Sequence, residues 1–127
     1  MELVLDQIFK NKEIVLDNIY YDFDKSDIRE DAKPTLNQLA NTLKQNPSIK
    51  IQLSSHTDCR GNEGYNEELS QRRAQSAVDY LISLGINANR LIAKGYGESN
   101  PAVICNCSNC TEEEHQKNRR TTFKILE

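Results

Sequence analysis

Apolar residues along this chain follow two different periods. Alternation over residues 14–23 predicts a strand, and alternation returns at Ile49, Ile51 and Leu53 to predict a second strand with one face in water. Between them, over residues 31–45, apolar positions recur every three or four residues, which predicts a helix that buries Ala32, Leu36, Leu39, Ala40 and Leu43. The opening of the chain therefore indicates a strand, a helix and a strand in succession.

A second helical pattern follows a glycine-containing loop over residues 56–64. Asn66 is the expected N-cap and Gly85 the expected end, with a buried stripe at Leu69, Ala74, Ala77, Val78 and Leu81. The remaining chain predicts a short strand, a loop, a short helix and a last strand, over residues 91–95, 98–110, 111–117 and 119–126. The element order β-α-β-α-β-β implies an α+β two-layer sandwich, in which helices pack on one face of a mixed sheet.

Composition narrows the class of protein. The 127 residues suit one domain, and a mean hydropathy of -0.70 without a long apolar run excludes a membrane span in this piece. A net charge of -3 argues against a nucleic-acid partner, because such proteins use excess Lys and Arg to displace counterions. The start lacks a signal peptide, yet four cysteines suit an oxidising compartment. We therefore interpret residues 1–13 as a lead-in segment left from the linker to a missing upstream region, and residues 14–127 as the domain.

Two adjacent arginines in the second helix have different surroundings. Arg72 follows Glu68 by four residues and can form an ordinary surface ion pair with it. Arg73 lies instead at the edge of the apolar stripe, where its stem can cover the core while the guanidinium reaches water. Asp58 leaves the end of a strand just before this helix, so the two side chains can face one another. This pair is either a structural salt bridge or a site for a zwitterion, in which Asp58 accepts an ammonium and Arg73 binds a carboxylate.

Spaced motifs around these residues resemble a known family. They are His56-Thr57-Asp58-x-x-Gly61, Tyr65-Asn66-x-x-Leu69-Ser70-x-x-Arg73-Ala74, Phe23-Asp24-Lys25-Ser26-Asp27-Ile28, Gly95-Tyr96-Gly97-Glu98 and Asn118-Arg119-Arg120. In this order, over about residues 14–127, they resemble the OmpA C-terminal family, the peptidoglycan-binding domain of OmpA-type porins, Pal-type lipoproteins and flagellar MotB proteins. The resemblance implies non-covalent binding of the peptidoglycan stem peptide, with no enzyme activity and no cofactor.

The resemblance also implies roles for individual residues. Asp58 and Arg73 would hold the diaminopimelate residue of the stem, and Asn66, Arg119, Asp24 and Thr57 would line the same pocket, with Asp24 acting through its backbone. Arg60 lies where the family varies and is a possible rim contact only. The implied role is to anchor an outer-membrane protein or lipoprotein to the cell wall from the periplasm, with any membrane contact made through the missing N-terminal region.

A cysteine-rich loop departs from the best-known members of that family. Cys105 and Cys107 are too close in sequence for an unstrained disulfide, which leaves Cys105–Cys110 with Cys59–Cys107, or Cys107–Cys110 with Cys59–Cys105. Free thiols are a third alternative, and a zinc site made by the three clustered cysteines and His115 is a fourth. We expect disulfides and no metal.

Two other classes of function stay open at this level. A peptidoglycan hydrolase would use Cys59 as nucleophile and His56 as base, although His56 on a strand end is more simply a structural histidine. An interaction module without wall binding would have no need for both Asp58 and Arg73. The binding interpretation accounts for more of the sequence than either alternative.

Overall fold

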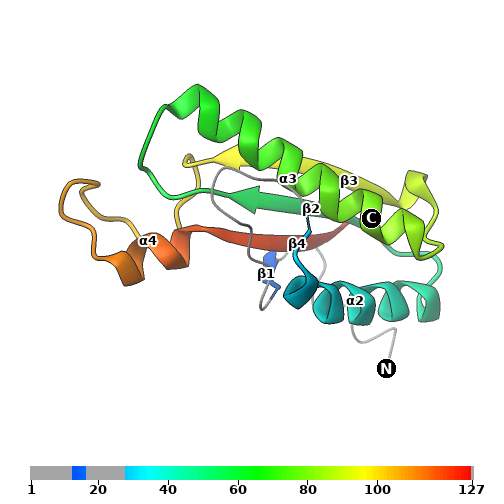
Figure 1. Cartoon of the computed structure of the whole chain (residues 1–127). Helices are drawn as coiled ribbons and strands as arrows, with labels where there is room; N and C mark the ends of the chain where they lie inside the picture. The colour runs from blue at the N-terminus through cyan, green and yellow to red at the C-terminus, as the bar shows by residue number, and fades with distance from the viewer. Residues whose placement is uncertain (1–12, 17–27, 127) are drawn as a thin grey trace.

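The structure, a computed structural model, describes residues 13–16 and 28–126, and its strands form one mixed sheet (Figure 1). The strands are β1 (Glu13–Val15), β2 (Lys50–His56), β3 (Leu91–Gly97) and β4 (Arg120–Leu126), in the order β1-β4-β2-β3. β2 pairs with β3 in parallel, whereas β4 is antiparallel to both β2 and β1. The predicted mixed sheet is confirmed. The strand predicted over residues 14–23 begins in β1, and its part from residue 17 onward lies outside the described residues.

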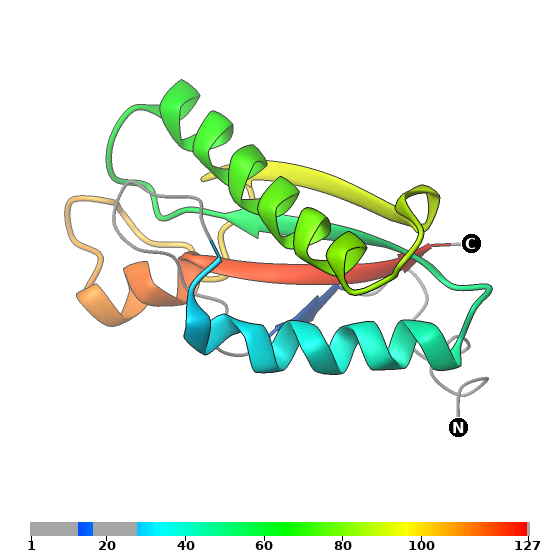
Figure 2. The ribbon, with the colours of Figure 1, turned by 45° about the vertical axis from the view of Figure 1, so that its right-hand side comes forward.

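Two long helices cover one face of this sheet (Figure 2). A 3-10 turn, η1 (Glu30–Ala32), leads into α2 (Lys33–Gln45), and α3 (Glu63–Ser83) packs on β2 and β3. A second 3-10 turn, η2 (Ala88–Arg90), precedes β3, and α4 (Glu112–Asn118) precedes β4. Both views place α4 at the end of the sheet where β2 runs into the loop before α3. This arrangement confirms the predicted α+β sandwich.

The core lies between these helices and the sheet. All five apolar positions predicted for α2 and all five predicted for α3 are buried, which confirms both periodic patterns. All of them except Leu69 and Ala74 belong to one core cluster with Ile51 and Leu53 of β2 and Phe123 and Ile125 of β4. None of the helices in the described ranges combines the length and the apolar character that crossing a membrane requires.

The N-cap predicted for the second helix is wrong. α3 begins at Glu63, and its N-cap is Asn62, whose side chain accepts a hydrogen bond from Tyr65 N at 3.0 Å. Asn66 lies inside the first turns and is buried. The helix starts earlier because Asn62 offers the same capping chemistry, and Gly64 within the first turn does not prevent helix formation. The predicted end at Gly85 is confirmed by its φ of 100° directly after the last turn.

The water-facing side predicted for β2 is only partly exposed. Lys50 is exposed and Gln52 half-buried, but Ser54 is buried. Gln52 Nε2 donates to Ser54 Oγ at 3.1 Å and to Tyr96 Oη at 3.2 Å, so polar side chains cover one another on this face. The strand therefore becomes more buried toward its C-terminal end, where the loop to α3 begins.

Two glycines of β3 let α3 approach the sheet closely. A Cβ at Gly95 would overlap the backbone of Gln71, and its amide donates to Gln71 Oε1 at 2.8 Å. Gly97 has a φ of 58°, and its amide donates to Ser70 Oγ at 2.8 Å. These contacts hold this part of α3 close to β3, and with it the following turn, in which Arg73 is buried.

Candidate functional site

Asp58 is the centre of a charged cluster at the end of β2. The strand hydrogen bonding extends one residue past β2, because Thr57 N donates to Gly97 O at 2.8 Å, and Asp58 follows directly. Its side chain is only 9% exposed. Oδ1 accepts from the backbone N of Arg60 at 2.9 Å, and Oδ2 accepts from Arg60 Nη2 at 2.8 Å and from Arg119 Nη1 at 2.6 Å. Asp58 and Arg119 are 61 residues apart in sequence, so this cluster joins the loop after β2 to the start of β4.

The cluster keeps the Asp58 carboxyl ionised. Burial alone raises its pKa, but the hydrogen bonds from Arg60 and Arg119 outweigh that effect and lower the pKa from 3.8 to about 2. An ionised carboxylate has about four acceptor positions. Three of these positions accept the hydrogen bonds from Arg60 and Arg119 given above. One acceptor position of the carboxylate therefore remains for a further donor.

Glu112, at the start of α4, joins both arginines from the outer side. Its carboxylate accepts from Arg119 Nη2 at 2.8 Å and from Arg60 Nη1 at 3.3 Å, and it is 67% exposed. The hydrogen bond from Arg119 is the main cause that lowers the pKa of Glu112. The sequence analysis missed Glu112 entirely. It also placed Arg60 at the rim, whereas Arg60 contacts the Asp58 carboxylate directly.

Asn66 holds the loop that presents Asp58. Its Nδ2 donates to Arg60 O at 2.9 Å and to Glu98 Oε1 at 3.2 Å, so it ties the loop before α3 to the end of β3. Gly61 lies in this loop, between Asp58 and Asn66, and its φ of 93° is a backbone conformation that favours glycine. Asn66 is therefore near Asp58 as predicted, but as a loop-holding residue and not as a cap.

The two arginines of α3 have different environments, as the sequence indicated. Arg72 donates to Glu68 Oε1 at 2.8 Å and is exposed, which confirms the surface pair. Arg73 is 8% exposed and lies on the face of α3 that packs against the sheet. Asp58 forms its ion pairs given above with Arg60 and Arg119. The zwitterion site formed by Asp58 and Arg73 stays a prediction.

One disulfide joins the cysteine-rich loop to this cluster, and a second lies within the loop itself. Cys59 bonds to Cys107 and Cys105 to Cys110, with Cα–Cα distances of 5.9 and 5.6 Å. This is the first of the two pairings that the sequence left open. Asn118, at the end of α4, also hydrogen-bonds both backbone groups of Val103 in that loop. The loop is thus fixed at one end to α4 and at the other to the residue beside Asp58.

Comparison with known proteins identifies the family. The model of the OmpA family matches residues 20–119, which is most of the chain. The chain belongs to the OmpA family. Peptidoglycan-associated lipoprotein of Brucella melitensis is 38% identical over 100 residues, which make up 79% of this chain and 60% of that lipoprotein. Outer membrane porin F of Pseudomonas aeruginosa is 37% identical over 109 residues, or 85% of this chain and 30% of the porin. The chain thus spans less than two thirds of these relatives.

A solved structure supports the same assignment. The crystal structure of the peptidoglycan-associated lipoprotein from Burkholderia pseudomallei aligns with a TM-score of 0.75 at 29% identity. The alignment covers 84% of this chain and 87% of that one. The OmpA-family resemblance inferred from spaced motifs is therefore confirmed at the level of sequence and of fold.

The remaining predicted site residues of this OmpA-family chain are buried or lie outside the described residues. Thr57 is buried, and its Oγ1 has no hydrogen-bond partner among the described residues. Asp24 lies outside the described residues. His56 stacks on Tyr96 with ring centroids 5.3 Å apart, and burial, followed by the charge of Arg120, lowers its pKa to about 4. His56 is thus a neutral, packed residue, as the structural interpretation expected.

Proposed function

We propose that this domain binds the peptide stem of peptidoglycan non-covalently and anchors an envelope protein to the cell wall from the periplasm. The observation that carries the proposal is the buried, ionised Asp58 between two arginines at the sheet end of an OmpA-family chain. Relatives named for peptidoglycan association and for the outer membrane support the choice of ligand and of compartment. The domain would be one part of a larger outer-membrane protein or lipoprotein.

The ligand group that fits the cluster is a zwitterion, such as the side-chain end of diaminopimelate. The ammonium of such a residue would donate to the free acceptor position of Asp58, and its carboxylate would pair with Arg73. Arg119 lies within the same cluster and would contribute a second guanidinium to the carboxylate. Thr57, Asn66 and Asp24 complete the proposed set of ligand-binding residues. Arg60 would lie closer to the ligand than the sequence suggested, because it contacts the Asp58 carboxylate directly.

Affinity for one stem peptide would be moderate. A hydrogen bond that involves a charged group contributes about 1.5–3 kcal/mol, and part of that is lost because Asp58 is already paired within the chain. A polymeric wall offers many stems at high local concentration, which raises the overall strength of attachment. Anchoring would therefore depend on the polymer.

The proposal includes no catalysis. A hydrolase would need the thiolate of Cys59, which is bonded to Cys107, and a base such as His56, which is buried against Tyr96. A hydrolase would release soluble fragments from purified sacculi, and a binding module would not. Incubation of the chain with sacculi, followed by chromatography of the supernatant, distinguishes the two.

The test of binding compares two adjacent arginines. Arg73→Ala should abolish co-sedimentation with purified sacculi, while Arg72→Ala, a matched control on the exposed side of the same helix, should pellet like the wild type. Circular dichroism checks that both variants fold, and Asp58→Asn, which keeps the side-chain volume, gives a second loss of binding. Full sedimentation of a folded Arg73→Ala chain would remove the proposed role of Arg73, and an interaction module without wall binding would not sediment in any form.

A further inference from the structure

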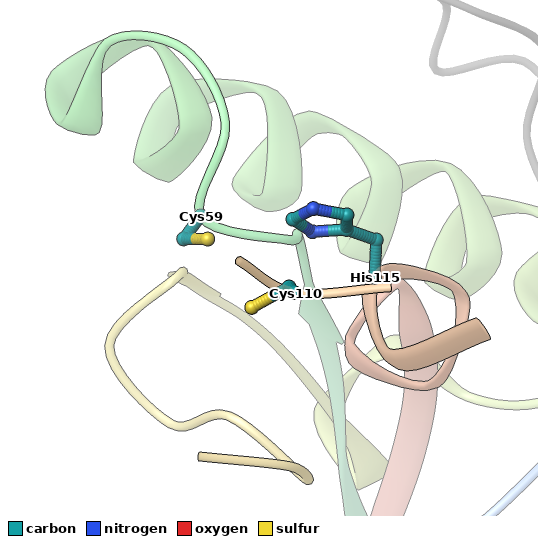
Figure 3. Close-up of side chains that lie close together, drawn as sticks. All are labelled: Cys59, Cys110 and His115. Carbon is teal, nitrogen blue, oxygen red and sulfur yellow. The ribbon is translucent and has the colours of Figure 1, made fainter. Parts of the chain in front are cut away.

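One cluster of metal-ligating side chains lies beside the candidate site and is not used by it. The sulfur atoms of Cys59 and Cys110 and a ring nitrogen of His115 all lie within 4.8 Å of one another. They come from the loop after β2, from the end of the cysteine-rich loop and from α4. Figure 3 shows the imidazole of His115 directed toward both sulfurs.

His115 is an unusual residue for a purely structural position. It is 5% exposed, and its Nδ1 is buried without a hydrogen-bond partner among the described residues. Such an orphaned buried nitrogen is costly, because it has given up water without gaining a partner. The imidazole is held in place by α4, whose capping box pairs Thr111 with Glu114 and whose backbone bonds His115 N to Thr111 O at 3.0 Å.

A fourth ligand is supplied by the partner of Cys59. Cys107 is bonded to Cys59, so its sulfur lies beside that of Cys59. Cys107-Ser108-Asn109-Cys110 also has the two-residue spacing between cysteines that is common in structural zinc sites. Tetrahedral zinc with Zn–S distances near 2.3 Å places its sulfur ligands about 3.8 Å apart. The Cys59, Cys110 and His115 donors need to contract by about 1 Å at most, whereas the sulfurs of Cys59 and Cys107 move apart to about 3.8 Å once the bond between them is broken.

We propose that the chain, when both disulfides are reduced, binds one Zn²⁺ through Cys59, Cys107, Cys110 and His115. Reduction takes two molecules of a dithiol, each of which gives two electrons and two protons to one disulfide and becomes a disulfide itself. Zn²⁺ then displaces the protons of the three thiols, which leave to solvent, and accepts the lone pair of an imidazole nitrogen of His115. The metal replaces the covalent link between the Asp58 loop and the cysteine-rich loop, so both redox states keep that loop in place.

The alternative donor set in this region is weaker. Cys105, Cys110 and Glu114 also lie within 4.8 Å of one another. Glu114, however, is already engaged, because its Oε1 accepts from Thr111 N at 2.8 Å in the capping box. A metal at that set would have to break the cap of α4, whereas His115 has an unsatisfied nitrogen to offer.

The first test measures zinc in two redox states of the full chain. The chain is treated with a dithiol or left oxidised, equilibrated with ZnCl₂, desalted and analysed by elemental mass spectrometry. We expect one zinc per reduced chain and none per oxidised chain. Reduced chain without zinc would overturn the proposal, and equal zinc in both states would show that the disulfides are not what controls the site. Neither outcome depends on peptidoglycan.

Variants then separate the two donor sets. His115→Ala should weaken zinc binding by roughly tenfold or more, whereas Cys105→Ser and Glu114→Gln should bind zinc like the reduced wild type. Titration with Co²⁺ guards against a folding artefact, since tetrahedral thiolate ligation gives characteristic ligand-field and charge-transfer bands. Loss of those bands in Cys105→Ser or Glu114→Gln, with retention in His115→Ala, would assign the metal to the other set and refute the proposal.

Discussion

The helix-covered layer and the charged end of the sheet are held together in different ways. In the layer, α2 and α3 bury apolar residues spaced three or four apart, against alternating residues of β2 and β4. At the charged end, contacts join residues far apart in sequence, such as Asp58 with Arg119 and Cys59 with Cys107. Periodic burial thus builds the scaffold, while a few long-range polar and covalent links place the site on it.

This contrast implies that stability and binding can be changed separately. Apolar burial in the layer supplies most of the folding free energy, and its core cluster consists of apolar residues. The ion pairs of Glu112 with Arg60 and Arg119 are partly exposed and contribute little to stability. In the proposed function these charged groups select the ligand. The two disulfides are the exception, because they belong to the charged end and yet constrain the unfolded chain.

The largest expected effect is the loss of the longer disulfide. Cys59 and Cys107 are 48 residues apart, so Cys59→Ser/Cys107→Ser should lower the free energy of unfolding by about 4 kcal/mol through loop entropy. The matched double variant Cys105→Ser/Cys110→Ser removes a disulfide that joins residues with a separation of only 5, and should cost about 2 kcal/mol. Urea unfolding measures both, and equal losses would mean that loop entropy does not set their contributions.

The next effect separates the layer from the site. Leu36 is fully buried in α2, and Leu36→Ala should lower the free energy of unfolding by about 3 kcal/mol through lost burial and a residual cavity. Sedimentation with sacculi well below the unfolding transition should not change, because Leu36 belongs to the apolar core cluster and is not one of the proposed ligand-binding residues. A folded Leu36→Ala chain that no longer sediments would show that the layer and the site are coupled.

A smaller effect involves His56, at the boundary between the two regions. Burial, and then the charge of Arg120, lower the pKa of His56 from 6.5 to about 4. Between these two pH values His56 is neutral in the folded protein but protonated in the unfolded chain. The unfolded state then binds more protons between these two values, and stability must fall as the pH falls from about 6.5 to about 4. The loss is at most about 3 kcal/mol.

Comparison with His56→Gln isolates this contribution. The variant should be less stable at neutral pH, but its free energy of unfolding should vary less over the same pH range. Urea unfolding at several pH values gives both slopes. Equal slopes for the two chains would show that another group causes the acid sensitivity.

The layer could be predicted from the sequence because its causes are local. Periodic apolar residues fix which faces of α2 and α3 are buried, and every predicted position in those stripes is buried. The start of α3 was predicted wrongly because Asn62 and Asn66 offer the same side chain four residues apart. A choice between them depends on tertiary contacts, namely those of Asn66 with Arg60 and Glu98.

The charged end could be predicted only in part. Motif resemblance pointed to Asp58, Asn66 and Arg119 together, and their clustering is what the structure shows around the Asp58 carboxylate and its loop. Glu112 carries no local pattern, since it contacts Arg60 across 52 residues of sequence. Disulfide pairing was narrowed to two alternatives by spacing, and the fold decides between them by bringing Cys107 to Cys59.

The smallest expected effect concerns Glu112 and bears on binding alone. Its carboxylate occupies Arg119 Nη2 and Arg60 Nη1 and so competes with any carboxylate of a ligand for the same guanidiniums. Glu112→Gln should therefore strengthen sedimentation with sacculi a few-fold and leave the melting temperature unchanged. Glu113→Gln, on the same exposed turn, makes the same change in net charge and should have a smaller effect. Weaker sedimentation of Glu112→Gln would mean that this carboxylate holds Arg60 and Arg119 in the positions that bind the ligand. Glu112 would then support binding and would not compete with the carboxylate of the ligand.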